Sequence, residues 1–543
     1  FNGQVAFVDA GVADSASLVS QFSSGTEIHL LDSSQDAIDQ ITSILANRSN
    51  ISAVHLVSHG SDGALLLGGK TVSDLNDYDA ELQQWSDSLS SDADILLYGC
   101  NVAADGTGKA FVNQLGQLTG ADVTASDDLT GSVTLGGDWT LEYSTGAIET
   151  AAIADTAYQD TLANFRVTTL NDVVDPNDGV ISLREAVNAA NTLGGSNNIF
   201  FNVNGTITLT GGELGISSNL SIFGNGASFT TISGNRVSAV FFISSGTVLL
   251  SGLTVTNGGA GESLGGGIFN SGNLTVQFCT LQGNSAFYGG GIGNRGTLTV
   301  NSSTFSGNSA GSGGGIYNDG GTLTVNSSTF SRNKAGSEGG GILNKSGTLT
   351  VNSSTFSDNM ASVGGGIDNE GTLTVNSSTF SGNQANGFGG GGIINRSTLT
   401  VSSSTFSGNR ATNGSGGGIV NTSIGTLTVN SSYFLNNQVS NIGGGLYNFG
   451  TATLIGNVIS QNRATNAGGG VYNDSGTVRL QLNNISSNTA PSGTDLFGAF
   501  VSGNSPTNPF GFNVIGKGGG FSGIVNGVNG DVILAPGQEL PQP

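Results

Sequence analysis

Apolar and polar residues repeat in one pattern along residues 265–488. Each copy carries a glycine run, an apolar residue and an asparagine, then a Thr-Leu-Thr-Val strand, a phenylalanine position and a second asparagine. The clearest copy begins at Gly313 and ends at Asn333. Apolar residues alternate with Thr and Ser, and no helical apolar period runs through the copy. The pattern therefore predicts short strands rather than helices.

The copies follow one another at a nearly constant spacing. Their first asparagine lies at positions 270, 294, 318, 344, 369, 395, 421, 448 and 473. A unit of about 25 residues cannot bury a core alone, so successive units must stack. We therefore predict a parallel β-helix (β-solenoid) whose coils each contain three short strands. One inward apolar column is expected at Leu281, Phe305, Phe330, Phe356, Phe380, Phe406, Phe434, Ile459 and Ile485.

The glycines and asparagines of the repeat have separate expected roles. Glycine runs suit turns in which φ is positive. The asparagines are expected to adopt the left-handed conformation and to form an amide ladder between coils. At roughly 4.8 Å per coil, the regular coils predict a rod of about 43 Å.

Residues 1–160 show a different pattern, in which apolar strands alternate with helices. Strands are predicted over 4–8, 27–32, 51–58, 95–98, 121–126 and 139–143, helices over 16–22, 34–48, 78–89 and 109–118, and a hairpin over 64–72. Such alternation predicts a mostly parallel sheet that helices cover on both faces.

Two residues with reactive side chains follow strands of this predicted sheet. His59 follows the third strand, and Cys100 follows the fourth. Because chemistry gathers at the carboxyl ends of central strands, Cys100 as nucleophile and His59 as base form one interpretation. The Gly60 N–H would then help to hold an oxyanion. The other interpretation is that both side chains are structural.

Composition and charge limit the function. The chain of 543 residues has 90 glycines and a net charge of −23, so nucleic acid is not an expected partner. No apolar run is long enough to predict a transmembrane helix. Cys100 and Cys279 give no disulfide framework, and Cys279 is expected in the core. A sequence that begins at Phe1 is expected to be a processed or partial product.

The patterns divide the chain into five parts. We predict an α/β domain over residues 1–150, a linker over 151–165, a capping helix with the first β-helix coils over 166–260, regular repeats over 261–490, and terminal coils with a tail over 491–543.

A polar segment precedes the first coils. Ser182 and Glu185 form a capping box that opens an amphipathic helix, which we expect to cover the open end of the solenoid. Oxygen ligands of the kind that calcium prefers lie just before it, at Asp172, Asp175, Asn177 and Asp178. These residues are either a calcium site or a solvated acidic loop, since they fit no EF-hand spacing. No other cofactor is expected.

Several motifs resemble those of bacterial surface proteins. The Phe-x-x-Asn and Gly-Gly-x-Ile motifs of residues 250–490 resemble the repeats of chlamydial polymorphic outer-membrane proteins and related β-helix surface proteins. That fold carries adhesins, passenger domains and polysaccharide enzymes alike. Residues 181–186 resemble the Cys-Ser-Leu-Arg-Glu-Ala segment that precedes β-helix repeats in secreted bacterial proteins. Ile181 stands in place of that family's cysteine, which removes any thiol role there.

The first domain has a resemblance of its own. Residues 4–150 resemble an uncharacterised N-terminal domain of very large bacterial surface proteins, common in cyanobacteria. The motifs are Ser58-His59-Gly60, Tyr98-Gly99-Cys100-Asn101, Thr119-Gly120-Ala121-Asp122-Val123 and Gly137-Asp138-Trp139. The His-Gly and Gly-Cys pair is similar to that of caspase-, gingipain- and separase-type cysteine peptidases. This resemblance implies a Cys100–His59 dyad, but no third catalytic group is evident.

Two minor alternatives concern the surface of the rod. Carbohydrate enzymes on β-helices need carboxylates clustered with Arg or Lys, and the charges of residues 265–489 look scattered in the sequence. Thr-x-Thr pairs such as Thr322 and Thr324 resemble the ladders of β-helical ice-binding proteins. Threonine is also an ordinary exposed strand residue.

The first hypothesis is an extracellular structural or adhesive surface protein, secreted or held at the cell surface. Its β-helix rod would present the α/β head and engage other copies of itself, matrix components or polysaccharide, with filaments as one form of assembly. The alternative is a cysteine peptidase-like head that cleaves itself or a partner.

Overall fold

The computed structural model describes residues 3–9, 12, 18–32, 35–61, 63–67, 70–133, 137–153, 162, 164–175, 180–193, 196–259, 264–503, 512–516 and 520–534. The chain forms two compact units. The head unit comprises Phe1–Thr169, Asp175–Asn202 and Ser218–Ile222, and the rod unit comprises Leu170–Val174, Val203–Ser217 and Phe223–Pro543. Each unit is described by itself below.

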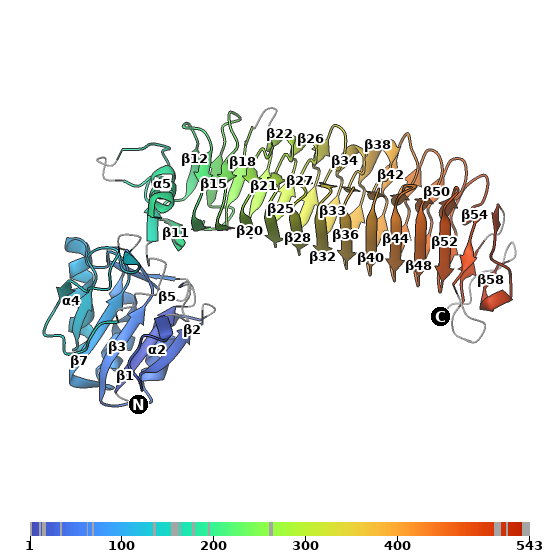
Figure 1. The fold of residues 1–543 in the computed structure, drawn as a ribbon. Coiled ribbons are helices and arrows are strands. Elements are labelled where there is room, and N and C mark those ends of the chain that lie inside the picture. The colour runs from blue at the N-terminus through green and yellow to red at the C-terminus, as the bar shows by residue number, and fades with distance from the viewer. Residues whose placement is uncertain are drawn as a thin grey trace. The chain divides into compact units, whose positions relative to one another are not determined.

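A six-stranded sheet forms the centre of the head unit, in the order β2-β1-β3-β7-β8-β9 (Figure 1). Its strands are β1 (Gln4–Asp9), β2 (Glu27–Leu31), β3 (Ile51–Val57), β7 (Leu89–Tyr98), β8 (Asp122–Ala125) and β9 (Tyr143–Ser144). Only the edge pair of β8 and β9 is antiparallel. The predicted mostly parallel sheet is confirmed. β7 begins well before the predicted Ile95. The prediction missed the first half of this strand because that half is polar and partly exposed.

Three of the described helices of the head pack on one face of this sheet. α2 (Ala37–Leu45), α3 (Asp79–Trp85) and α4 (Gly106–Thr119) bury Ile41, Leu82 and Phe111 in one apolar cluster. The opposite face buries Leu18, Trp139 and other apolar residues in a second cluster. Leu18 lies in a helical turn, so part of a helix covers this second face too, as predicted. The helix predicted over 16–22 lies partly outside the described residues.

A hairpin and a capped helix complete the head. The hairpin predicted over 64–72 is confirmed by the antiparallel strands β4 (His59–Ser61), β5 (Ala64–Leu67) and β6 (Lys70–Val72), with the short helix η1 (Leu75–Tyr78) after them. Helix α5 (Leu183–Leu193) packs against β10 (Asn164–Val167) and β11 (Ser196–Phe201).

The capping box at the start of α5 is confirmed. The Ser182 N–H donates to Glu185 Oε2 over 2.8 Å, and the Glu185 N–H donates to Ser182 Oγ over 3.1 Å. These two bonds satisfy N–H groups that have no partner inside the helix. The predicted role of α5 as a solenoid cap stays a prediction.

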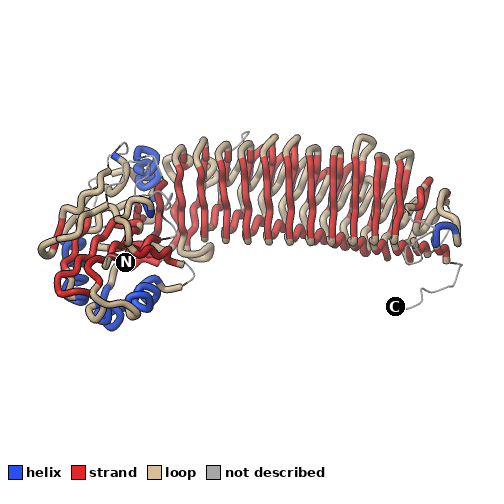
Figure 2. Tube along the Cα trace, turned by 60° about the horizontal axis from the view of Figure 1, so that its bottom comes forward, coloured by secondary structure: helices blue, strands red, loops and turns tan. Residues whose placement is uncertain are grey.

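The rod unit is a stack of short parallel strands, and each regular coil adds one strand to each long sheet (Figure 2). One coil contains β27 (Ile316–Asp319), β28 (Thr322–Asn326), β29 (Thr329–Ser331) and β30 (Lys334–Ala335), and the next contains β31 (Ile342–Lys345), β32 (Thr348–Asn352), β33 (Thr355–Ser357) and β34 (Met360–Val363). The solenoid prediction is confirmed. The predicted number of three strands per coil is too small for these coils. The polar segment after the second asparagine also pairs with its counterpart in the next coil, and these segments form an eight-stranded sheet from β22 (Ser285–Tyr288) to β50 (Arg463–Ala464).

The predicted phenylalanine column is present. Phe330 pairs in register with Phe356, which pairs with Phe380. Ring centroids from Phe305 to Phe434 are 4.6 to 4.9 Å apart, with interplanar angles of 4° to 9°. The spacing of the rings equals the spacing of hydrogen-bonded strands, so each ring fills the space between two coils.

Both asparagine columns form buried ladders. In the first, each Nδ2 donates to the Oδ1 of the next coil over 2.7 to 2.9 Å. In the second, which runs from Asn284 to Asn488, both the backbone N–H and Nδ2 donate to the next Oδ1 over 2.8 to 3.1 Å. The predicted ladder is confirmed.

The left-handed conformation predicted for these asparagines is wrong. Positive φ belongs to the residue just before the second asparagine, such as Gly307 (61°), Arg332 (53°) or Asp358 (54°). The asparagine itself must face inward to bond with its neighbours in the ladder. The first glycine of each run also has positive φ, as at Gly313 (68°), whereas a Cβ on Gly315 would lie 2.6 Å from the Gly341 carbonyl oxygen of the next coil.

The second ladder ends on an aspartate, and so does a further buried ladder that runs through Asn457, Asn483 and Asn513. The Asn488 N–H and Nδ2 donate to Asp495 Oδ1, and the Asn513 N–H and Nδ2 donate to Asp531 Oδ1. Asparagine both accepts and donates, so each member of a ladder needs a further acceptor in the next coil. A carboxylate only accepts, which suits it to the last position.

Candidate functional site

The strands that lead to His59 and Cys100 are neighbours, as predicted. β3 pairs with β7, and Val57 lies opposite Tyr98 at their carboxyl ends. His59 and Cys100 are both buried just beyond these ends. The Cys100 Sγ accepts from the Thr130 N–H over 3.1 Å and donates to the Thr130 carbonyl over 3.4 Å. Among the described contacts, none joins this sulfur to the imidazole of His59.

The surroundings of Cys100 favour the neutral thiol. Burial raises the pKa of this thiol to about 12, and the Asp128 carboxylate adds to the rise, while hydrogen bonds from Thr130 and Leu162 oppose it. The thiolate is the form that attacks, so a raised pKa disfavours attack by this sulfur. Whether the dyad is catalytically competent stays a prediction.

Gly60 and Gly99 have a structural reason to be glycine. A Cβ on Gly60 would lie 2.6 Å from the Gly99 carbonyl carbon, and one on Gly99 would lie 3.0 Å from the Gly60 Cα. The two strand ends thus approach too closely for side chains. The Gly60 N–H, which the sequence suggested for an oxyanion, donates to the Leu162 carbonyl over 3.2 Å. In this arrangement it is already engaged.

Three carboxylates lie close together near Cys100. Asp128, Asp138 and Glu142 place one oxygen each within 4.8 Å of one another. Burial raises the pKa of Asp128, and the neighbouring carboxylates, Glu142 first, raise it further. This group could not be predicted from the sequence, because the spacing of its three members matches no known ligand motif.

The predicted calcium segment is only partly described. The Asp172 carboxylate accepts from the N–H groups of Thr210 and Gly211 over 2.6 and 2.9 Å. The Asp175 N–H donates to Glu185 Oε1 over 2.6 Å. Asn177 and Asp178 lie outside the described residues. The Asp172 carboxylate therefore holds a backbone turn of the rod, and calcium binding at this segment stays a prediction.

A cluster of charged side chains lies on one side of the rod, where the sequence had suggested scattered charges. We call Glu338, Lys345, Asp368, Glu370 and Arg396 the flank cluster. The Arg396 guanidinium donates to both oxygens of Asp368 over 3.2 Å and lies 3.8 Å from Glu338 and from Glu370. Lys345 donates to Glu370. The interpretation of these charges as scattered was wrong.

The register of the coils explains the cluster. In five successive repeats the residue after the first asparagine is charged, and these residues are Arg295, Asp319, Lys345, Glu370 and Arg396. Asp319 lies opposite Lys345 on the neighbouring strand, and Arg295 donates to Asp319 over 2.9 Å. Opposite charges on adjacent strands attract one another. Aligning the repeats at their asparagines would have revealed this alternation.

One member of the flank cluster is fully buried. Asp368 is 0% exposed, and burial raises the pKa of its carboxyl to about 7, although Arg396 opposes the rise. It continues the column of Tyr317 and Leu343 on the neighbouring strands. A buried carboxyl at this position depends on the Arg396 guanidinium for compensation.

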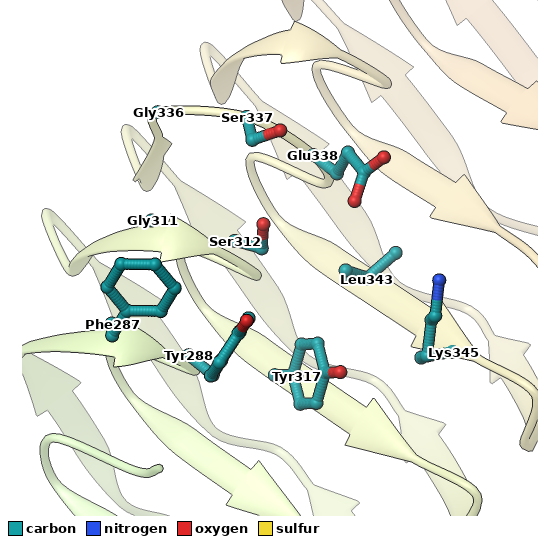
Figure 3. A pocket seen from close by; sticks show the side chains of 10 residues that line it. All are labelled: Phe287, Tyr288, Gly311, Ser312, Tyr317, Gly336, Ser337, Glu338, Leu343 and Lys345. Carbon is teal, nitrogen blue, oxygen red and sulfur yellow. The ribbon is translucent and has the colours of Figure 1, made fainter. Parts of the chain in front are cut away.

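A pocket of about 500 Å³ adjoins the cluster (Figure 3). Figure 3 shows the rings of Phe287, Tyr288 and Tyr317 along one part of it, with Glu338 and Lys345 further along. Ser312, Ser337, Leu343, Gly311 and Gly336 line the rest. Tyr288 lies with its ring centroid 4.7 Å from that of Phe287 and 4.9 Å from that of Tyr317. This pocket could not be predicted from the order of residues along the chain, because its lining comes from several successive coils.

Comparison with known proteins found two family matches. Residues 5–165 match the family described as a domain of unknown function (DUF4347), and residues 302–319 and 327–345 match the Chlamydia polymorphic membrane protein repeat. No curated protein and no solved structure matches the chain. Among the described residues, no helix is both long and apolar enough to cross a membrane. The repeat match and the solenoid agree in indicating a protein similar to surface proteins with β-helix repeats.

Proposed function

We propose that this chain is an extracellular structural and adhesive protein, in which a β-helix rod carries an α/β head at a cell surface or in a matrix. The observation that carries this proposal is the regular register of the coils in the long sheets. From Phe305 to Phe434 successive coils bury the same columns of Leu, Val, Phe and Asn, so the rod is a stiff element with long, regular outer faces. The match to polymorphic membrane protein repeats supports a surface location.

The chemistry of the head supports a role in binding more than in cleavage. The Cys100 thiol is held neutral and buried, and the Gly60 amide is engaged by a backbone carbonyl. A peptidase would need a thiolate that its substrate can reach. We therefore assign the head a binding or assembly role, with cysteine peptidase activity as the alternative.

Adhesion is tested with beads that carry the full chain. The expected result is that coated beads aggregate with one another or attach to a polysaccharide or protein matrix, with and without calcium, while albumin-coated beads do neither. Coated beads that stay dispersed and unattached under all these conditions would contradict the proposal. Calcium-dependent attachment would in addition support the predicted calcium site.

The alternative has its own test. The full chain and its Cys100→Ala variant are incubated alone and with an unfolded protein, and intact masses are measured. Identical, uncut masses are the expected result. Fragments that form only when Cys100 is present would identify the head as a peptidase.

A further inference from the structure

The pocket beside the flank cluster combines apolar rings with polar side chains. Phe287 is 50% exposed and Tyr288 is 38% exposed, whereas Tyr317, whose ring lies next to that of Tyr288, is 9% exposed. The two rings lie side by side on β22, and the neighbouring strand β26 (Ser309–Ser312) carries Ser312 opposite Tyr288. The rings thus form a local apolar platform on a largely polar surface.

Polar groups stand beside this platform. The Glu338 and Lys345 side chains are partly exposed, at 30% and 43%, and both line the pocket together with the hydroxyls of Ser312 and Ser337. A carboxylate accepts hydrogen bonds, an ammonium donates them, and a hydroxyl does both. Their ion-pair partners in the flank cluster, Arg396 and Glu370, hold the two charged side chains on the wall of the pocket.

A sugar chain matches this combination of groups. A pyranose ring has an apolar face of C–H groups that stacks on an aromatic ring, and its hydroxyls both donate and accept hydrogen bonds. Pockets of about 300–1,000 Å³ are usual for small ligands. The pocket has one carboxylate and one ammonium, and the chain carries a net charge of −23, which repels anionic polymers. The charges therefore favour a neutral sugar.

We propose that this pocket binds a segment of a neutral polysaccharide, with Phe287 and Tyr288 as the stacking platform and Glu338 and Lys345 as hydrogen-bonding groups. The site is one of binding rather than cleavage. Asp368, the carboxyl whose proton affinity would suit a general acid, is fully buried behind Arg396 and cannot reach a bound sugar. This proposal names a ligand for the proposed adhesive function. Binding of the sugar can be measured independently of adhesion, and only its biological role rests on the proposed function.

The experiment is calorimetric titration of the full chain with cellohexaose, laminarihexaose and maltohexaose, and with hexagalacturonate as an anionic probe. At least one neutral hexasaccharide is expected to bind. The Tyr288→Ala and Phe287→Ala variants are each expected to bind it about tenfold more weakly, because each loses one stacking surface. Tyr433→Ala is the matched control, since this exposed tyrosine lies on a different sheet, on β45 (Tyr433–Leu435). Its affinity is expected to be unchanged.

Three results would overturn the proposal. The first is that no neutral hexasaccharide binds at millimolar concentration. The second is that hexagalacturonate binds more strongly than the neutral hexasaccharides. The third is that Tyr433→Ala loses as much affinity as the Tyr288→Ala and Phe287→Ala variants. Circular dichroism of each variant checks that the rod is folded. Coated beads that still adhere when the sugars fail to bind would overturn the pocket alone and leave the adhesive function standing.

Discussion

The rod and the head use buried polar groups in opposite ways. In the rod, each buried asparagine repeats a bond that its neighbours also make, so Asn359 accepts from Asn333 and donates to Asn383. In the head, each buried polar contact occurs once, as when Trp85 Nε1 donates to Thr42 over 2.9 Å. A repeated contact leaves a period in the sequence, whereas a single contact leaves none. Repeated contacts of a fold can therefore be predicted from the sequence alone, whereas single contacts cannot.

The same difference allows the two units to be followed separately. Both tryptophans of the chain, Trp85 and Trp139, lie in the head. Their fluorescence therefore reports head unfolding, and far-UV circular dichroism reports mainly the strands of the rod. Each prediction below changes one unit and expects the signal of the other to stay constant.

The largest effect is expected from Asn359→Ala. This change removes the acceptor of the Asn333 N–H and Nδ2 groups and the donor to Phe330 and Asn383, all in a buried site. Buried polar groups without partners are costly, so the free energy of unfolding of the rod should fall by about 3 kcal/mol or more. Denaturation followed by circular dichroism measures the change, and the tryptophan transition should not move.

Asn466→Ala is the control for the ladder. This asparagine also bonds across coils, to Asn441 Oδ1 over 2.8 Å, but it is exposed. Water can replace the lost partner, so the expected change is within about 0.5 kcal/mol. If both variants lost the same stability, burial of the ladder would not be what stabilises the rod.

Much of the rod could be predicted from the sequence. The periodic Leu, Val, Phe and Asn positions fixed which side chains face inward, since a side chain's neighbours in the next coil are its own counterparts. The prediction of a positive φ for the asparagines was wrong because it gave one residue both the left-handed turn and the place in the amide ladder. The turn in fact belongs to the residue before it, such as Asp358.

The surroundings of Cys100 could not be predicted in this way. The predicted neighbourhood of the strands that lead to His59 and Cys100 is confirmed, but the Cys100 sulfur bonds to Thr130, which is 30 residues away. No period or motif links these residues. The flank cluster was missed for a different reason: its charges are periodic, but only when repeats are aligned rather than read along the chain.

An intermediate effect is expected from Asp368→Asn in the rod. Because burial raises the pKa of Asp368 from 3.8 to about 7, the folded rod binds a proton more tightly than the unfolded chain. This group therefore reduces the stability of the rod as pH rises from about 4 to about 7. Asn at this position cannot ionise. Between pH 4 and pH 8 the midpoint temperature of thermal unfolding of the rod should therefore fall by a few degrees less in the variant than in the wild type. Arg396, Glu338 and Glu370 remain in both proteins, and parallel curves for the two would contradict the burial argument.

The smallest effect is expected in the head, from Arg48→Ala. The Arg48 guanidinium donates to Glu27 and, with a smaller contribution from His29, lowers the pKa of Glu27 from 4.5 to about 2. A lowered pKa stabilises the fold above pH 4.5, and this stabilisation is lost as pH falls toward 2. Both side chains are partly exposed, so solvent screening limits the loss at pH 7 to about 0.5–1 kcal/mol. Tryptophan fluorescence during denaturation should show wild type and variant converging as pH falls from 5 to below 3, while the circular dichroism of the rod stays the same for both. A difference in stability that persists at low pH would mean that Arg48 acts through the packing of its side chain and not through its charge. The isolated ion pair of the head would then contribute little to stability.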